Sequence, residues 1–169
     1  GYLPEDLGFY DEMTGLENLV YTALLNGLSK REAEEKAKEL MHRVGLSEQA
    51  NKKTGKYSRG MRQRLGLADV LIKNPEIIIL DEPTSGIDPA GIQEFIELIR
   101  NLSRVHSFTV LFSSHNLDQV QKACDRVGLF NHGELLAQLD LKEMEGKQVE
   151  LIDVYNDYVK EGGEKHEQS

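Results

Sequence analysis

Ile77-Ile78-Ile79-Leu80-Asp81-Glu82-Pro83 places four large apolar residues directly before two carboxylates and a proline. An unbroken apolar run of this kind is typical of a parallel strand whose two faces are both covered by helices. In such sheets, ligands bind beyond the carboxyl ends of the strands, where Asp81 and Glu82 would lie. Because successive strand residues point to opposite sides, one carboxylate can hold a cation while the other faces a water. A role for Asp81 as a simple cap of the following turn is equally compatible with this stretch.

A second apolar run, residues 108–112, ends shortly before His115. Between the two runs, Asp88 and Pro89 predict the N-cap and the first residue of a helix. The order strand, helix, strand over residues 77–130 predicts right-handed crossovers and a parallel α/β core. At the carboxyl end of its strand, His115 can donate to a phosphate or orient a water, although an isolated histidine is more often structural or merely exposed.

Two capping boxes predict a helical hairpin before this core. Thr14 with Glu17, and Ser29 with Glu32, are each followed by apolar residues at helical spacing. Ser58 predicts the N-cap of a third helix, whose first N–H groups would attract an anion such as phosphate. A plain cap followed by basic surface residues is the alternative for Ser58.

The sequence after the core predicts smaller elements. Asn131-His132-Gly133 indicates a hairpin turn between two strands, and Asp140 indicates the cap of a brief helix. An apolar stripe over residues 151–159 predicts a last helix. Residues 161–169 are rich in Gly and Glu and are expected to fray.

Composition excludes several classes of protein. The net charge of −9 and the isoelectric point near 5.1 argue against a nucleic-acid-binding surface, because phosphate neutralisation needs clustered Lys and Arg. Cys124 is the single cysteine of the 169 residues, so no internal disulfide is possible. No apolar run approaches the roughly 20 residues that cross a bilayer. The chain begins at Gly1 rather than at Met, which indicates a processed or truncated chain.

Taken in order, these motifs resemble the nucleotide-binding domain of ABC transporters over nearly the whole chain. Glu5 falls at the position of the Q-loop, and Tyr57-Ser58-Arg59-Gly60-Met61 is similar to the signature motif. Residues 77–81 are similar to the Walker B strand, with Glu82 as the catalytic glutamate. Further along the chain, the resemblance places the D-loop at residues 85–88 and the switch histidine at His115.

Three departures from the family pattern stand out. Met61 and Glu5 occupy positions where Gln is usual, and both variants resemble those of ABC-2-type exporter ATPases for drugs, polysaccharides or sodium. The 169 residues contain no Gly-x-x-x-x-Gly-Lys-Ser/Thr, the P-loop or Walker A motif. The resemblance therefore implies that this motif lies before Gly1, and that the chain is the C-terminal portion of the domain, without ATPase activity of its own.

The implied fold is a partial P-loop NTPase (RecA-like) parallel sheet core with an α-helical subdomain inserted before the signature motif. In chain order, the expected parts are the Q-loop region (1–13), the helical subdomain ending in the signature helix (14–74), the remaining α/β core (75–147), and the C-terminal helix with a frayed tail (148–169).

The resemblance also implies ATP and Mg²⁺, each bound by particular residues. Asp81, with help from Glu5, would hold Mg²⁺, while Glu82 polarises the attacking water and His115 contacts the γ-phosphate. The residues expected to contact the nucleotide are Glu5, Ser58, Arg59, Gly60, Met61 and Asp88.

The implied partners are a second nucleotide-binding subunit, identical or not, and a transmembrane permease that would hold the protein at the cytoplasmic face of the membrane. Two other interpretations stay open. One is a non-enzymatic interaction module whose helical insert docks on a partner. The other is part of a soluble ABC ATPase in translation or DNA repair, which the acidic charge, Met61 and Glu5 disfavour. The transported substrate and the direction of transport are not determined by the sequence.

Overall fold

The computed structural model describes residues 1–147 and 150–166, and it forms two compact units, residues 1–113 and residues 114–169. The four-part organisation expected from the sequence is not tested by this division and stays a prediction. Within the described part of the chain, no helix has the length and apolar content needed to cross a membrane.

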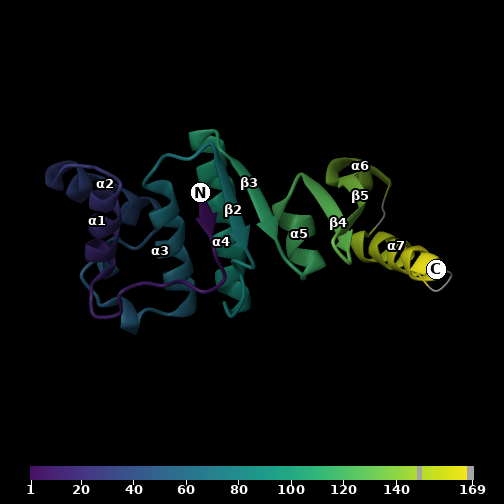
Figure 1. Ribbon diagram of the computed structural model, residues 1–169, viewed down its shortest axis with the longest axis horizontal. Coiled ribbons are helices and arrows are strands. Elements are labelled where there is room, and N and C mark those ends of the chain that lie inside the picture. Colours follow the sequence, from purple (N-terminus) through teal and green to yellow (C-terminus); the bar gives the residue numbers. More distant parts are fainter. Residues whose placement is uncertain (148–149, 167–169) are drawn as a thin grey trace. The chain divides into compact units, whose positions relative to one another are not determined.

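The first unit contains a parallel sheet, as predicted (Figure 1). Among the described residues this sheet ends at Ser113, because residues 126–131, expected in the same parallel core, pair antiparallel with residues 134–140 instead. Its strands lie in the order β1 (Tyr2–Leu3), β2 (Ile77–Asp81), β3 (Thr109–Ser113). Asp81 lies opposite Ser113 in the register of β2 and β3, and Leu80 lies opposite Leu3. The carboxyl end of β2 therefore has a neighbouring strand on each side.

The helices of this unit begin where their capping residues predict. They are α1 (Gly15–Leu25), α2 (Lys30–Arg43), α3 (Arg59–Leu71) and α4 (Pro89–His106), with short 3₁₀ turns η1 (Ser47–Gln49) and η2 (Thr54–Lys56). The capping boxes of Thr14 with Glu17 and of Ser29 with Glu32 are both formed. In the first box, the Thr14 N–H donates to Glu17 Oε2 at 2.7 Å, and the Glu17 N–H donates to Thr14 Oγ1 at 3.1 Å.

Helix α3 lies at the centre of the unit, between the α1–α2 hairpin and the sheet (Figure 1). It contacts both hairpin helices, β1 and α4. Leu65 and Leu67 of α3 are fully buried, together with Leu19 of α1 and Leu40 of α2. Burial of these side chains ties the hairpin to the sheet through one hydrophobic core.

The burial of β2 differs from the sequence expectation. Ile78 and Leu80 are fully buried, but Ile77 is 57% exposed and Ile79 is 41% exposed. Strand residues alternate between the two faces of a sheet, so the described residues cover one face of β2 and leave the other open. The prediction that helices cover both faces is therefore wrong for the described structure. An apolar run cannot by itself distinguish a strand covered on two faces from one covered on a single face.

The second unit is built around an antiparallel hairpin. Its elements are α5 (Leu117–Ala123), β4 (Arg126–Asn131), β5 (Glu134–Asp140), α6 (Leu141–Lys147) and α7 (Leu151–His166). His132 and Gly133 have φ values of 47° and 83°, as a type I′ hairpin turn requires, which confirms the predicted turn. Helix α7 is described through His166, and the fraying expected for residues 161–169 stays a prediction. Residues 148–149 and 167–169 lie outside the described structure.

One buried side chain of α3 lacks hydrogen-bond partners. Gln63 is 0% exposed, and neither its Nε2 nor its Oε1 has a partner among the described residues. Replacing Gln63 by Met, which has nearly the same shape, is expected to raise the free energy of unfolding by about 1–3 kcal/mol, because a buried polar group without partners is costly. Urea denaturation measures the change. The control is Gln93→Met at an exposed site on α4, and a destabilised Gln63→Met protein would contradict the expectation.

Candidate active site

Asp81 and Glu82 lie at the carboxyl end of β2, and both are half-buried. Glu82 has a φ of 42°, a left-handed conformation that is uncommon for a non-glycine residue and that clusters at functional sites. Its carbonyl accepts a hydrogen bond from the Ser85 N–H at 3.0 Å, which closes the turn after the strand. The strand thus ends at Asp81, and the backbone changes direction at Glu82.

The Asp81 carboxylate is held by hydroxyl groups from both neighbouring strands. Ser113 Oγ donates to Asp81 Oδ1 at 2.7 Å, and Tyr2 OH donates to Asp81 Oδ2 at 3.1 Å. The hydrogen bond to Asp81 raises the pKa of Tyr2, with burial and the carboxylate charge adding to the effect. Sequence reasoning missed Tyr2 and Ser113. The place of Ser113 at the carboxyl end of β3 is a signal that could have found it, whereas Tyr2 is the first residue of β1 and has no such signal.

The Asp81 carboxylate suits Mg²⁺. A carboxylate has about four lone-pair positions, so it can accept two hydroxyl hydrogen bonds and still coordinate a hard cation. The described residues contain no group of three or more His, Cys, Asp or Glu that could hold a metal. The metal roles of Asp81 and Glu5 stay predictions.

The amino-terminal end of α3 is capped by Ser58, which is exposed, while Arg59, Gly60 and Met61 are half-buried. The Met61 N–H donates to Ser58 Oγ at 3.2 Å, which confirms Ser58 as the N-cap. Gly60 lies against the turn after β2, since a Cβ atom at Gly60 would be 3.6 Å from Ile87 Cγ2. The first N–H groups of a helix have no intrahelical acceptor and carry partial positive charge. This end of α3 can therefore receive an anion.

The Arg59 side chain does not extend from this helix end toward solvent. Its Nη2 donates to the Glu5 carbonyl at 2.7 Å, and its Nε donates to the Ser85 carbonyl at 3.1 Å. The structure thus brings together the Glu5 loop, the start of α3 and the turn after Glu82. The Glu5 side chain itself is exposed.

Asp88 and His115 are the remaining predicted residues. Asp88 caps α4, where its Oδ1 accepts a hydrogen bond from the Gly91 N–H at 3.0 Å. His115 is exposed and precedes α5 in the second unit, whereas the two carboxylates belong to the first. The first unit by itself therefore presents a carboxylate pair, a helix terminus and a turn, without the histidine.

The comparisons with known proteins all point to one family. The family described as "ABC transporter" matches residues 1–85. The chain is similar to the uncharacterised ABC transporter ATP-binding protein YxlF of Bacillus subtilis, with 43% identity over 161 residues that cover 95% of this chain and 53% of that protein. It is also similar to the bacitracin transport ATP-binding protein BcrA of Bacillus licheniformis, with 41% identity over 139 residues, or 82% of this chain and 44% of that protein.

Among solved structures, the chain is similar to cbiO1 from Clostridium perfringens, which is described as part of the ABC transporter complex cbiONQ. The TM-score is 0.78 at 26% identity, and the match covers 98% of this chain and 65% of that chain. The chain spans about half the length of the curated relatives named above.

Proposed function

Because the chain belongs to the ABC transporter family, we propose that it forms part of an ATP-binding subunit that hydrolyses ATP to drive transport across a membrane. The observation that carries this proposal is the geometry of the end of β2. Asp81 is held there by two hydroxyl groups, and Glu82 follows it in a left-handed backbone conformation. The two carboxylates are adjacent in sequence, but Asp81 ends the strand and Glu82 has a left-handed backbone, which suits two separate roles.

Glu82 serves as the general base of this reaction. Its carboxylate accepts a proton from the water that attacks the γ-phosphate, while His115 contacts the same phosphate group. Asp81 holds Mg²⁺, which when bound neutralises charge that develops on the phosphate oxygens. The hydroxyl groups of Ser113 and Tyr2 keep the Asp81 carboxylate in one orientation. These assignments are supported by the positions of Asp81 and Glu82 at the carboxyl edge of a parallel sheet, where ligands bind.

The capped end of α3 binds the phosphates of an ATP that is held mainly by a second nucleotide-binding subunit. Ser58, Gly60 and Met61 belong to its first turn, whose N–H groups and helix dipole attract anions. Arg59 contributes its backbone N–H there, because its side chain is engaged with Glu5 and Ser85. Asp88 and Glu5 complete the proposed set of residues that contact the nucleotide.

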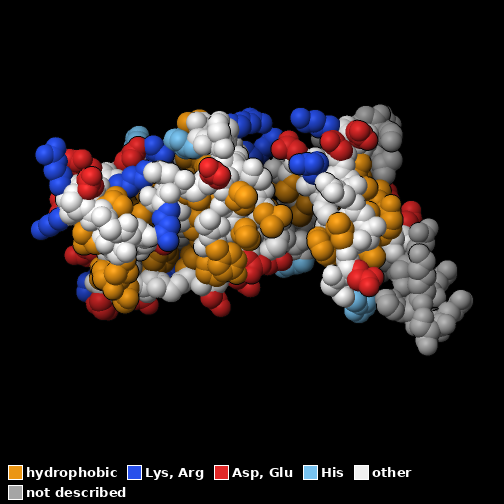
Figure 2. Space-filling model, turned by 45° about the horizontal axis from the view of Figure 1, so that its top comes forward, with side chains coloured by type: hydrophobic (Ala, Val, Ile, Leu, Met, Phe, Trp, Pro, Cys, Tyr) orange, Lys and Arg blue, Asp and Glu red, His pale blue; other side chains and the backbone are white. Residues whose placement is uncertain are grey.

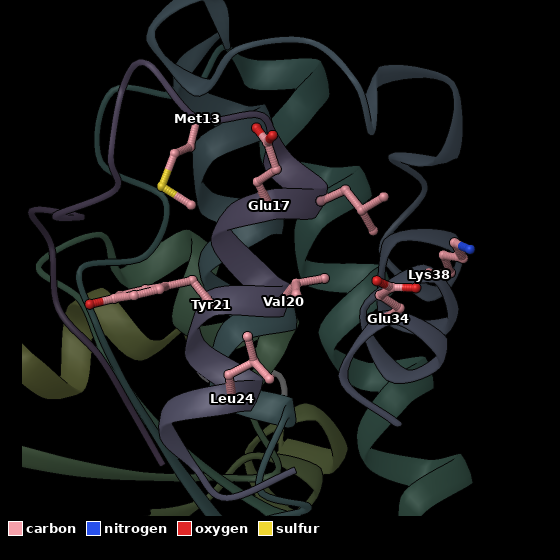
Figure 3. A pocket seen from close by; sticks show the side chains of 8 residues that line it. Met13, Glu17, Val20, Tyr21, Leu24, Glu34 and Lys38 are labelled. Carbon is pink, nitrogen blue, oxygen red and sulfur yellow. The ribbon is translucent and has the colours of Figure 1, made fainter. Parts of the chain in front are cut away.

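A groove on the helical hairpin is proposed to receive a helix of a transmembrane permease (Figure 3). It encloses about 460 Å³ along α1 and α2. Its lining comprises Met13, Leu16, Glu17, Val20, Tyr21, Leu24, Glu34 and Lys38. Figure 2 shows hydrophobic side chains at the surface of the helical hairpin, among charged ones.

The lining of the groove indicates what it would bind. Tyr21 is 40% exposed and Leu24 is 42% exposed, so both offer apolar contact area to a partner. The Glu34 carboxylate lies at the edge of the groove, close to Lys38 (Figure 3). An amphipathic helix with an apolar face and a basic residue opposite Glu34 fits this arrangement. Through this contact the protein would be held at the cytoplasmic face of the membrane.

A comparison of two proteins tests the proposed function. The first is the 169-residue chain by itself, and the second is a chimera in which these residues replace the matching segment of a longer relative. The isolated chain, which contains no P-loop motif, is expected to show neither saturable binding of Mg·ATP nor phosphate release. The chimera is expected to show both. A folded chimera that binds Mg·ATP without hydrolysing it would overturn the proposal.

A further inference from the structure

The Arg59 side chain contacts two separate segments of the first unit. Its Nη2 donates to the Glu5 carbonyl at 2.7 Å, its Nε donates to the Ser85 carbonyl at 3.1 Å, and its Nη1 lies 3.8 Å from the Asp6 carboxylate. The aliphatic part of the side chain lies against Gly86, where a Cβ atom would be 3.5 Å from Arg59 Cγ. Gly86 has a φ of 71°, which glycine adopts without strain.

The two segments belong to different parts of the proposed ATP-binding subunit. Glu5 lies in the loop that connects β1 to the helical hairpin and its groove. Ser85 lies in the turn that starts at Glu82, whose carbonyl accepts the Ser85 N–H at 3.0 Å. One guanidinium group therefore hydrogen-bonds to residues 54 and 26 positions away along the chain. Its planar set of donors allows both bonds at once, whereas a lysine ammonium is a single point charge.

Arg62 provides a natural comparison. One helical turn further along α3, its Nη2 donates to the Leu7 carbonyl at 3.0 Å, and its Nη1 donates to Asp11 Oδ1 at 2.7 Å. Arg62 therefore holds the same loop as Arg59. A further hydrogen bond from Arg62 Nη1 goes to the Thr54 carbonyl at 3.1 Å, and none of these three bonds reaches the turn after Glu82.

We propose that Arg59 is a positioning residue that couples the Glu5 loop to the turn carrying Glu82, so that a displacement of the loop shifts this turn. The role of this coupling rests on the proposed function, because the Glu5 loop would move with the permease and the turn would position Glu82, the proposed general base. The coupling itself is a property of the chain without nucleotide. The coupling can therefore be tested separately from ATP hydrolysis.

Amide hydrogen exchange, measured by NMR on the 169-residue chain, tests the coupling. The reporters are the Ser85 and Ile87 amides, which donate within the turn to the carbonyls of Glu82 and Thr84. Arg59→Met keeps the aliphatic contact with Gly86 but removes the donors, and it is expected to speed exchange of both amides about tenfold. Arg64→Met is the matched control, because Arg64 of the same helix bonds to Glu94 and to the Val44 carbonyl.

A double variant separates coupling from simple local support. Arg62→Met loosens the Glu5 loop from its other side and is expected to speed exchange in the turn about threefold through Arg59. In the Arg59→Met background, the same change is expected to add nothing at the turn. If Arg59 supports the turn only locally, Arg62→Met leaves turn exchange unchanged in the original background, and if its effect persists in the Arg59→Met background, the coupling runs by another route; either outcome overturns the proposal. Unchanged turn exchange in Arg59→Met also overturns it.

Folding is checked in the same spectra. The Leu28 and Leu46 amides, which donate to the Ala23 and Met41 carbonyls, report on the helical hairpin and should keep their exchange rates in every variant. If Arg59→Met does not fold, Arg59→Lys replaces it and is expected to speed turn exchange about threefold, because one bond of the two can be kept. Wild-type exchange in a folded Arg59→Lys protein would then count against the coupling.

Discussion

In the chimera that tests the proposed function, replacing Glu82 by Gln is expected to lower the rate of ATP hydrolysis by about 10²–10⁴-fold while Mg·ATP still binds. The amide of Gln has the shape of the carboxylate but cannot take a proton from the attacking water. Glu and Gln have side chains of the same shape, so the substitution should not change the strain of the left-handed backbone at residue 82, whose φ is 42°. Phosphate release and nucleotide binding on the same preparation measure the two parts of this expectation.

Glu97→Gln is the control for this substitution. It removes an exposed carboxylate from α4, away from the end of β2, and the rate of hydrolysis should stay unchanged. A Glu82→Gln chimera that hydrolyses ATP at the original rate would show that another group serves as the base. Loss of nucleotide binding in this variant would instead point to a structural role for Glu82.

Replacing Phe95 by Ala is expected to lower the free energy of unfolding by about 3–5 kcal/mol. Phe95 lies on α4, is 1% exposed, and belongs to the core cluster that also contains Leu65 of α3 and Ile78 of β2. Truncation removes buried apolar area and leaves a cavity that the surrounding helices fill only in part. Because domains are commonly stable by only about 5–15 kcal/mol, such a loss would unfold much of the protein in mild denaturant.

Urea denaturation followed by circular dichroism measures this change, with Val105→Ala as the matched control. Val105 lies on the same helix but is 73% exposed, so its truncation should change the free energy of unfolding by less than about 0.5 kcal/mol. Similar midpoints for the two variants would mean that α4 is not packed on the core as described.

Local signals predicted most of the secondary structure correctly. Thr14, Ser29, Ser58 and Asp88 each predicted a helix start, and each accepts a backbone hydrogen bond as an N-cap. These signals work because a cap and the N–H groups that it satisfies lie within three residues of each other. The fraying expected for residues 161–169 stays a prediction.

The candidate site was predicted in part. The acidic end of β2 placed Asp81 and Glu82 correctly, because a strand and the residues after it are read directly from the chain. Asp81 was expected either to hold a cation or to cap the following turn. In the structure its oxygens accept hydroxyl hydrogen bonds from Tyr2 and Ser113. The cation-binding role stays a prediction.

By itself the sequence determined the order of the motifs, the parallel strands, the helix starts and the family, all of which depend on residues close together in the chain. Only the tertiary structure decided which groups touch the carboxylates and what Arg59 does. The Tyr2 hydroxyl reaches Asp81 across 79 positions, and Arg59 reaches the Glu5 carbonyl across 54. It also decided that β2 is buried on one face, because burial depends on which elements pack against a strand and not on how apolar its residues are.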